Sequence, residues 1–149
     1  MISKILVPTD GSKAAQKAAK YAVDLAKQTG ATITFLSVID KRLTVSQSIP
    51  SEASPTHLIE PIEDYLRQAA ESYTGEIESL CRQKGIKSKS IIQSGHPVEV
   101  IVKEAEKIKA DLIVMGSHGK SAIKATVLGS VTYGVIHKDT IIPVLLVRK

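Results

Sequence analysis

Short apolar segments alternate with longer segments of helical periodicity along the whole chain, and this alternation constrains the fold more than any other feature. The segments typical of buried strands are 4–8, 31–38, 86–93, 111–115 and 143–147. Between them, apolar residues recur at helical spacing at 13–29, from Thr56 or Glu60 to Lys84, at 97–108 and from Ser130 to near Lys138. Strands that alternate with helices form a parallel sheet covered on both faces. We therefore expect an α/β protein with an open parallel sheet in one domain, residues 1–149.

Capping residues, glycine and proline predict where these helices begin and end. Ser12 or Asp10 can cap the first helix, and Gly30 can end it in a left-handed conformation. Pro61 is tolerated only near a helix start, so the second helix could begin there. The buried stripe of that helix is expected at Ile62, Leu66, Ala69, Tyr73, Ile77 and Leu80. Residues 39–54 are expected to form a loop long enough to act as a lid.

The segment that follows the fourth predicted strand carries a distinctive set of glycines. Gly116 and Gly119 come directly after the strand, and Gly129 and Ser130 stand where the next helix begins. Glycine lets a backbone approach a ligand closely, and the first N–H groups of a helix have no acceptor within the helix. A strand, a glycine loop and a helix start in this order are typical of a phosphate-binding site.

Two familiar phosphate-binding loops do not fit this pattern. Gly119-Lys120-Ser121 looks like the end of a Walker A loop, but that loop needs a glycine at position 114, where Val114 stands. A dinucleotide fingerprint needs a glycine at position 118, where His118 stands. The chain therefore carries a third kind of glycine loop.

The spacing G-x2-G-x9-G-S resembles that of the ATP-binding branch of the universal stress protein family. The opening segment, residues 5–12, resembles the first strand of that family, and residues 143–148 resemble its last strand. The resemblance covers nearly the whole chain. It implies a five-stranded sheet of order 3-2-1-4-5, the adenine nucleotide alpha hydrolase-like arrangement. In that order the loops after strands 1 and 4 meet at the point where strand order reverses, which is where ligands of open parallel sheets bind.

The resemblance also implies a set of residues that bind the nucleotide. Pro8, Thr9 and Asp10 would face the adenosine part, although Asp10 could instead be only a helix cap. The backbone of Val38 would read the adenine edge and Met115 would line the base pocket, but both could equally be core residues. The residues expected around the phosphates are Gly116, Ser117, His118, Gly119, Lys120, Ser121, Ala122, Gly129, Ser130, Val131 and Thr132. Of these, Lys120 could instead point to solvent, and Thr132 is a weaker candidate for phosphate binding than Ser130 and Val131.

No other motif indicates a metal site or a catalytic group. The four histidines are isolated in the sequence, so we predict no metal site built by the protein, and Mg or Mn would arrive with the triphosphate. His118 lacks a recognisable orienting partner for general-base catalysis. We therefore expect an ATP-binding protein that acts as a nucleotide-dependent switch or adaptor in the stress response. The alternatives are a slow ATP hydrolase or phosphotransferase and a sensor of AMP or cyclic AMP.

Charge and hydropathy narrow the expected partners and location. The formal charge is +5, but the lysines are scattered and the chain has one Phe and no Trp, so a nucleic-acid partner is not expected. No apolar segment approaches about 18 residues, no signal peptide is recognisable, and Cys81 is the single cysteine, so we expect a cytoplasmic protein without a membrane span. The last strand, residues 143–147, is apolar throughout. We expect it to pair with its copy in a homodimer, as is common in the family.

Overall fold

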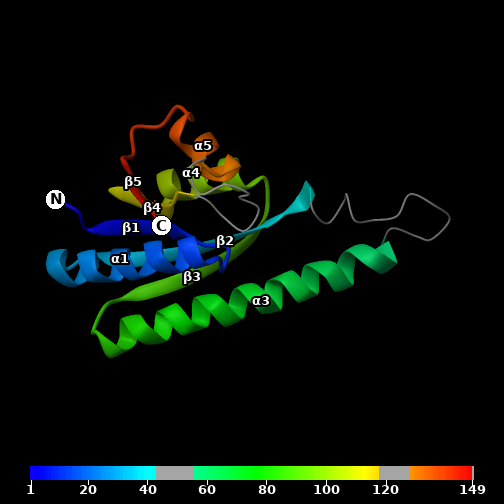
Figure 1. Ribbon diagram of the computed structural model, residues 1–149, viewed down its shortest axis with the longest axis horizontal. Helices are drawn as coiled ribbons and strands as arrows, with labels where there is room; N and C mark the ends of the chain where they lie inside the picture. The colour runs from blue at the N-terminus through cyan, green and yellow to red at the C-terminus, as the bar shows by residue number, and fades with distance from the viewer. Residues whose placement is uncertain (43–55, 118–127, 149) are drawn as a thin grey trace.

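Five parallel strands form one sheet in the order β3-β2-β1-β4-β5. The computed structural model describes residues 1–42, 56–117 and 128–148 (Figure 1). The strands are β1 (Lys4–Pro8), β2 (Thr32–Asp40), β3 (Ser88–Gly95), β4 (Leu112–Gly116) and β5 (Val144–Val147). The strand order expected from the resemblance is therefore confirmed, and it places β1 beside both β2 and β4.

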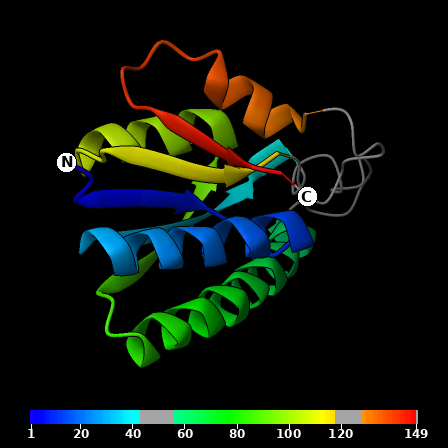
Figure 2. The same cartoon turned by 60° about the vertical axis from the view of Figure 1, so that its left-hand side comes forward.

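In the described part of the chain, four helices cover the two faces of this sheet. They are α1 (Lys13–Thr29), α3 (Thr56–Gln83), α4 (Pro97–Lys107) and α5 (Ser130–Ile136). Figure 2 shows α1 and α3 on one side of the sheet and α4 and α5 on the other. Each side has its own apolar core: Phe35 and Val114 belong to the cluster under α1 and α3, and Leu36 and Ile113 to the cluster under α4 and α5. Alternate residues of a strand thus fill alternate cores.

Helix α1 begins and ends where its sequence predicts. Of the two candidate caps it is Ser12 that caps the helix, because its hydroxyl accepts a hydrogen bond from the Ala15 N–H at 3.1 Å. Gly30 ends the helix at φ 78°, and its N–H donates to the Ala26 carbonyl. The buried face of α1 is made mostly of alanines, so the helix can lie close to the sheet.

The segments around the predicted lid differ from the sequence-based expectation. Strand β2 continues two residues past Val38, because it keeps pairing with β3 as far as Asp40 opposite Gly95. Residues 43–55, most of the expected lid, lie outside the described residues. Helix α3 begins at Thr56, the earlier of the two predicted starts, so Pro61 stands inside the helix and the alternative start at Pro61 is wrong.

The buried stripe of α3 also differs from the prediction. Among the residues of α3 whose burial is described, the fully buried ones are Ala70, Thr74 and Cys81, and each of the six predicted residues is only partly buried. The helix lies over β2 and β3 at one end of the sheet, which leaves part of its apolar side at the border of the core. None of the described helices is long and apolar enough to cross a membrane.

Candidate functional site

A cavity of about 640 Å³ opens at the carboxyl ends of β1, β2 and β4. This is the point where strand order reverses between β1 and β4, the position at which open parallel sheets bind ligands. The cavity is lined by Pro8, Thr9, Asp10, Ser12, Ala15, Leu36, Ser37, Val38, Ile39, Asp40, Arg42, Leu66, Ala69, Tyr73, Pro97, Ile101, Met115, Gly116, Gly129, Ser130, Val131 and Thr132. Residues from segments that are far apart in the sequence therefore line one cavity.

The loop between β1 and α1 forms one wall of this cavity. The Thr9 N–H donates to the Leu36 carbonyl at 2.8 Å, which fixes the end of β1 to β2. The Gly11 N–H donates to the Thr9 hydroxyl at 3.3 Å, and the Ser12 N–H donates to Asp10 Oδ1 at 2.9 Å. Asp10 thus shapes the turn and also lines the cavity, so the turn role and a binding role are compatible.

The end of β4 and the start of α5 form the opposite wall, and several hydrogen bonds hold them together. The buried hydroxyl of Thr132 donates to the Gly116 carbonyl at 2.9 Å. The Gly129 N–H donates to the Ser117 carbonyl at 2.9 Å, which ties together the residues on either side of the segment 118–128. The Ser117 N–H in turn donates to the Val147 carbonyl at 3.2 Å. The two ends of the predicted phosphate loop are therefore fixed to the sheet.

The structure brings most of the predicted site residues to this one cavity. Those that line it are Pro8, Thr9, Asp10, Val38, Met115, Gly116, Gly129, Ser130, Val131 and Thr132. Ser117 is not among the lining residues; its backbone N–H and carbonyl bond Val147 and Gly129. The residues His118, Gly119, Lys120, Ser121 and Ala122 lie outside the described part of the chain. Val38 and Met115 each line the cavity and also pack in the core under α4 and α5, so a core role and a place at the cavity are compatible.

Sequence reasoning missed the side of the cavity that α3 contributes. Tyr73 lines the cavity, and its hydroxyl forms a hydrogen bond with the hydroxyl of Ser37. Burial raises the pKa of the Tyr73 phenol above its ordinary value, and the nearby Asp10 carboxylate acts in the same direction. The helical pattern marks Tyr73 as part of a buried stripe, and nothing in the sequence distinguishes it from a core residue.

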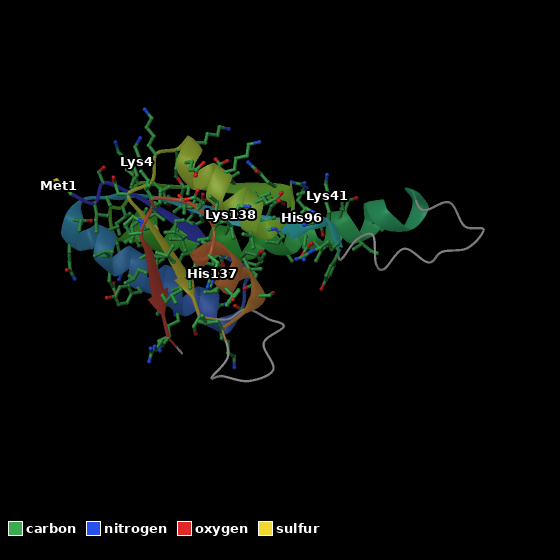
Figure 3. The ribbon with its side chains drawn as sticks, turned by 90° about the horizontal axis from the view of Figure 1, so that it is seen from above. Met1, Lys4, Lys41, His96, His137 and Lys138 are labelled. Carbon is green, nitrogen blue, oxygen red and sulfur yellow. The ribbon has the colours of Figure 1, made fainter. Side chains whose placement is uncertain are left out.

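Sequence reasoning also missed an ion pair at the end of β2. Arg42 contacts Asp40 through both ends of its guanidinium, with Nε to Oδ1 at 3.0 Å and Nη2 to Oδ2 at 2.9 Å. Chiefly through these hydrogen bonds, Arg42 holds the pKa of Asp40 below its usual value, and His96 adds a smaller effect. Figure 3 shows His96 and Lys41 at the same end of the molecule. The extension of β2 beyond its expected end is what places Asp40 at the cavity.

Metal-binding groups are sparse in the part of the chain that the structure describes. No three His, Cys, Asp or Glu side chains of that part lie close enough together to hold a metal ion. The two carboxylates that line the cavity, those of Asp10 and Asp40, already accept hydrogen bonds from Ser12 and Arg42. The described cavity thus offers hydroxyl and backbone groups, one ion pair and a largely apolar wall.

Sequence comparison relates the whole chain to known proteins. Residues 1–148 match the profile of the Universal stress protein family. The chain is 36% identical over 149 residues to Universal stress protein MJ0531 of Methanocaldococcus jannaschii, covering 100% of this chain and 84% of that protein. It is 37% identical over 157 residues to Universal stress protein MJ0577 of the same organism, covering 100% and 96%.

Comparison with solved structures agrees with the sequence comparison. The solved structure of MJ0577 superimposes with a TM-score of 0.85 at 36% identity and covers 100% of this chain and 97% of that one. A universal stress protein solved in complex with cAMP superimposes with a TM-score of 0.64 at 25% identity and covers 99% and 97%.

Proposed function

Because the chain belongs to the universal stress protein family, we propose that it binds an adenine nucleotide, ATP in preference to others, in the cavity between the β1 and β4 ends. The bound nucleotide would act as a switch that sets whether the protein engages its partner in the stress response. The observation that carries this proposal is the convergence in one cavity of residues from the loop after β1 and residues from both ends of the glycine segment. Its volume of about 640 Å³ lies in the range of small-molecule sites, roughly 300–1,000 Å³.

The two walls of the cavity suit the two parts of a nucleotide. Thr9, Asp10 and Val38 lie on the β1 and β2 side, where the adenosine part would be held. Gly116 and the residues 129–132 lie on the β4 side, where the phosphates would be held. The Gly129 N–H is already bonded to Ser117, whereas the next N–H groups belong to the first helical turn and have no intrahelical acceptor.

The backbone conformation of Gly129 indicates that glycine stands here for its small size and not for its conformational freedom. Its φ of −63° and ψ of 153° are accessible to any residue, so the turn does not require glycine. As the N-cap of α5 it provides no side-chain hydrogen bond, and a serine or an aspartate would cap the helix better. We infer that glycine stands here because a side chain would occupy the space of the phosphates.

A divalent cation would be held mainly by the phosphate oxygens and water, as Mg and Mn are in many nucleotide sites. Hydrolysis of the bound ATP would be slow. The lowered pKa of Asp40 makes its carboxylate a weak base at neutral pH, and it is already paired with Arg42. We expect phosphate release far below the typical enzyme rate of about 10 per second. A rate near that value would favour the hydrolase alternative.

The second candidate function is a sensor of AMP or cyclic AMP. The specific observation in its favour is the structural likeness to a universal stress protein in complex with cAMP. Titration calorimetry with ATP, ADP, AMP and cyclic AMP, with and without Mg, separates the two functions. We expect ATP to bind most tightly, and preferential binding of cyclic AMP or AMP would favour the sensor.

A matched pair of glycine variants locates the site. Gly129→Leu adds a large side chain to a residue that lines the cavity and should abolish ATP binding in the same calorimetric titration. Gly75→Leu makes the same exchange on α3, where nothing lies within 4 Å of an added Cβ, and should leave binding unchanged. Wild-type affinity in a folded Gly129→Leu protein would show that the nucleotide binds elsewhere.

We also propose that two copies of the chain pair through β5. Its residues Val144–Val147 are apolar, and β5 is an edge strand of the sheet. An apolar edge with unpaired backbone groups is a template for pairing with another strand. Antiparallel pairing about a two-fold axis would satisfy both edges at once.

A further inference from the structure

The side chain of Tyr73 joins three elements at the nucleotide cavity. It comes from α3, its ring lies against the β1–α1 loop, and its hydroxyl reaches the ends of β1 and β2. Tyr73 is only partly buried, yet its hydroxyl has two polar neighbours, so its contacts go beyond the apolar packing of a helix on a sheet.

The contact between the ring and the loop is close. A Cβ added to Gly11 would lie 2.6 Å from Cδ2 and 2.9 Å from Cε2 of the Tyr73 ring, so only a glycine lets the ring lie there. The same residue has φ +78°, a conformation that favours glycine in its own right. The turn and the ring are thus fitted to each other, and a shift of one displaces the other.

The hydroxyl group adds a polar anchor to this contact. It is hydrogen-bonded to Ser37, whose side chain is 2% exposed, and it lies 3.5 Å from the Thr9 carbonyl oxygen. Thr9 begins the loop and its hydroxyl accepts the Gly11 N–H, while Asp10 accepts the Ser12 N–H. A phenol anchored to β2 therefore braces the whole turn that carries Asp10.

We propose that Tyr73 is a positioning residue of the nucleotide site, which holds the loop of residues 9–12 in the shape that presents Asp10 to the ligand. The inference rests on the proposed function for the identity of the ligand, but not for the bracing of the loop. A loop held in its bound shape before the ligand arrives costs less to order on binding, which raises affinity. Tyr73 would act on the adenosine side of the site, because its hydroxyl and ring contact Ser37 of β2 and the loop after β1.

The test compares Tyr73→Phe with Tyr65→Phe, which removes a hydroxyl from the same helix at a side chain 71% exposed. Amide hydrogen exchange by NMR, without nucleotide, measures the bracing directly. In Tyr73→Phe the Gly11 and Ser12 amides should exchange roughly three- to tenfold faster, the factor expected from loss of one intramolecular hydrogen bond. The Gly30 amide at the other end of α1 should keep its rate, and Tyr65→Phe should change none of the three. Unchanged exchange at Gly11 and Ser12 in Tyr73→Phe overturns the inference, and so does a uniform acceleration that includes Gly30.

Calorimetry then connects the bracing to the ligand. The affinities of ATP and AMP should fall by similar factors in Tyr73→Phe, because both ligands share the adenosine side, and loss of affinity for ATP alone would contradict the inference. Should Tyr73→Phe fail to fold, Ser37→Ala removes the hydroxyl's partner and leaves the ring in place. The same accelerated exchange is expected there, and wild-type rates in Ser37→Ala overturn the proposal. If the wild-type protein binds no nucleotide, the proposed function fails, while the exchange comparison still decides whether Tyr73 braces the loop.

Discussion

Two positions in the cavity region carry glycine for different physical reasons. A Cβ added to Gly116 would lie 2.9 Å from the carbonyl oxygen and 3.0 Å from the carbonyl carbon of Ala14, so this glycine lets the end of β4 lie against the first turn of α1. Gly129 has an ordinary backbone conformation, and we assign its small size to the ligand. Gly116 is therefore a packing residue as well as a candidate binding residue. A variant at this position would confound loss of binding with loss of stability.

The packing role of Gly116 leads to a prediction on stability. Gly116→Ala should lower the free energy of unfolding by roughly 1–3 kcal/mol, because the obstructing atoms belong to the backbone of α1 and cannot rotate away. Gly75→Ala should raise it by roughly 0.5–1 kcal/mol, since alanine is favoured over glycine within a helix and the space is open. Urea denaturation of both variants and the wild type checks this. Equal stabilities of Gly116→Ala and the wild type would show that α1 adjusts without cost.

At the scale of elements, α5 is attached to the sheet chiefly at its beginning. It has seven residues, of which Thr132 and Val135 are buried, and elsewhere it packs on α4, where a Cβ added to Gly134 would lie 2.5 Å from Cγ2 of Val98. The Thr132 hydroxyl bonds the Gly116 carbonyl, and the Gly129 N–H bonds the Ser117 carbonyl. A short helix is only marginally stable without tertiary contacts. These two hydrogen bonds therefore fix the position of the first turn of α5 at the cavity.

The bond from Thr132 can be tested with a replacement of nearly equal shape. Thr132→Val should lower the free energy of unfolding by roughly 1–3 kcal/mol, because the buried Gly116 carbonyl loses its hydroxyl donor. Thr32→Val is the matched control: the exposed Thr32 hydroxyl donates to the Ser3 carbonyl at 3.4 Å, where water can replace it, and that carbonyl also accepts the Thr32 N–H. Thermal and urea denaturation measure both variants. A loss no larger in Thr132→Val than in Thr32→Val would mean that α5 does not depend on this bond.

At the scale of the whole molecule, the two edge strands differ in how well they are protected against pairing with a strand of another molecule. Strand β3 carries Lys89 and several serines, and α3 packs against it. Strand β5 is apolar, and Ile141 just before it is 99% exposed. Charged and polar edges resist pairing, whereas apolar edges invite it. The asymmetry favours β5 as the surface where two copies meet.

The register of β5 shows how to break that pairing without breaking the fold. The Pro143 carbonyl accepts a hydrogen bond from Ile113 of β4, and the Val147 carbonyl accepts one from Ser117, the residue after β4. Because backbone groups alternate along a strand, those of Leu146 point away from β4, toward the free edge. Leu146→Pro removes an outward N–H and should convert the dimer to a monomer in multi-angle light scattering at micromolar concentration. Tyr65→Lys, which changes an exposed apolar side chain on α3, should remain dimeric. A monomeric wild type, or a dimeric Leu146→Pro protein, would exclude β5 as the interface.

The sequence alone determined the elements and much of the site. Alternating strand and helix periodicity indicated an open parallel sheet, because these periodicities are local properties of the chain. Ser12 and Gly30 bounded α1 as predicted, since capping depends on neighbouring residues only. Residue type singled out the glycine segment, and the family resemblance singled out the loop after β1. The residues of both that lie in the described part mostly line the cavity.

Only the tertiary structure decided which residues complete that cavity. Strand β2 reaches Asp40 because β3 lies beside it, and a pairing partner is not visible in local periodicity. Tyr73 reaches Ser37 and Gly11 because α3 packs on β2 and β3, which brings the Tyr73 ring against the loop after β1. Glycine is required at position 116 because the backbone of Ala14 in α1 lies too close to the end of β4 for a side chain. These two elements are about a hundred residues apart in the chain. Such contacts follow from how elements pack, and packing joins positions that no local pattern connects.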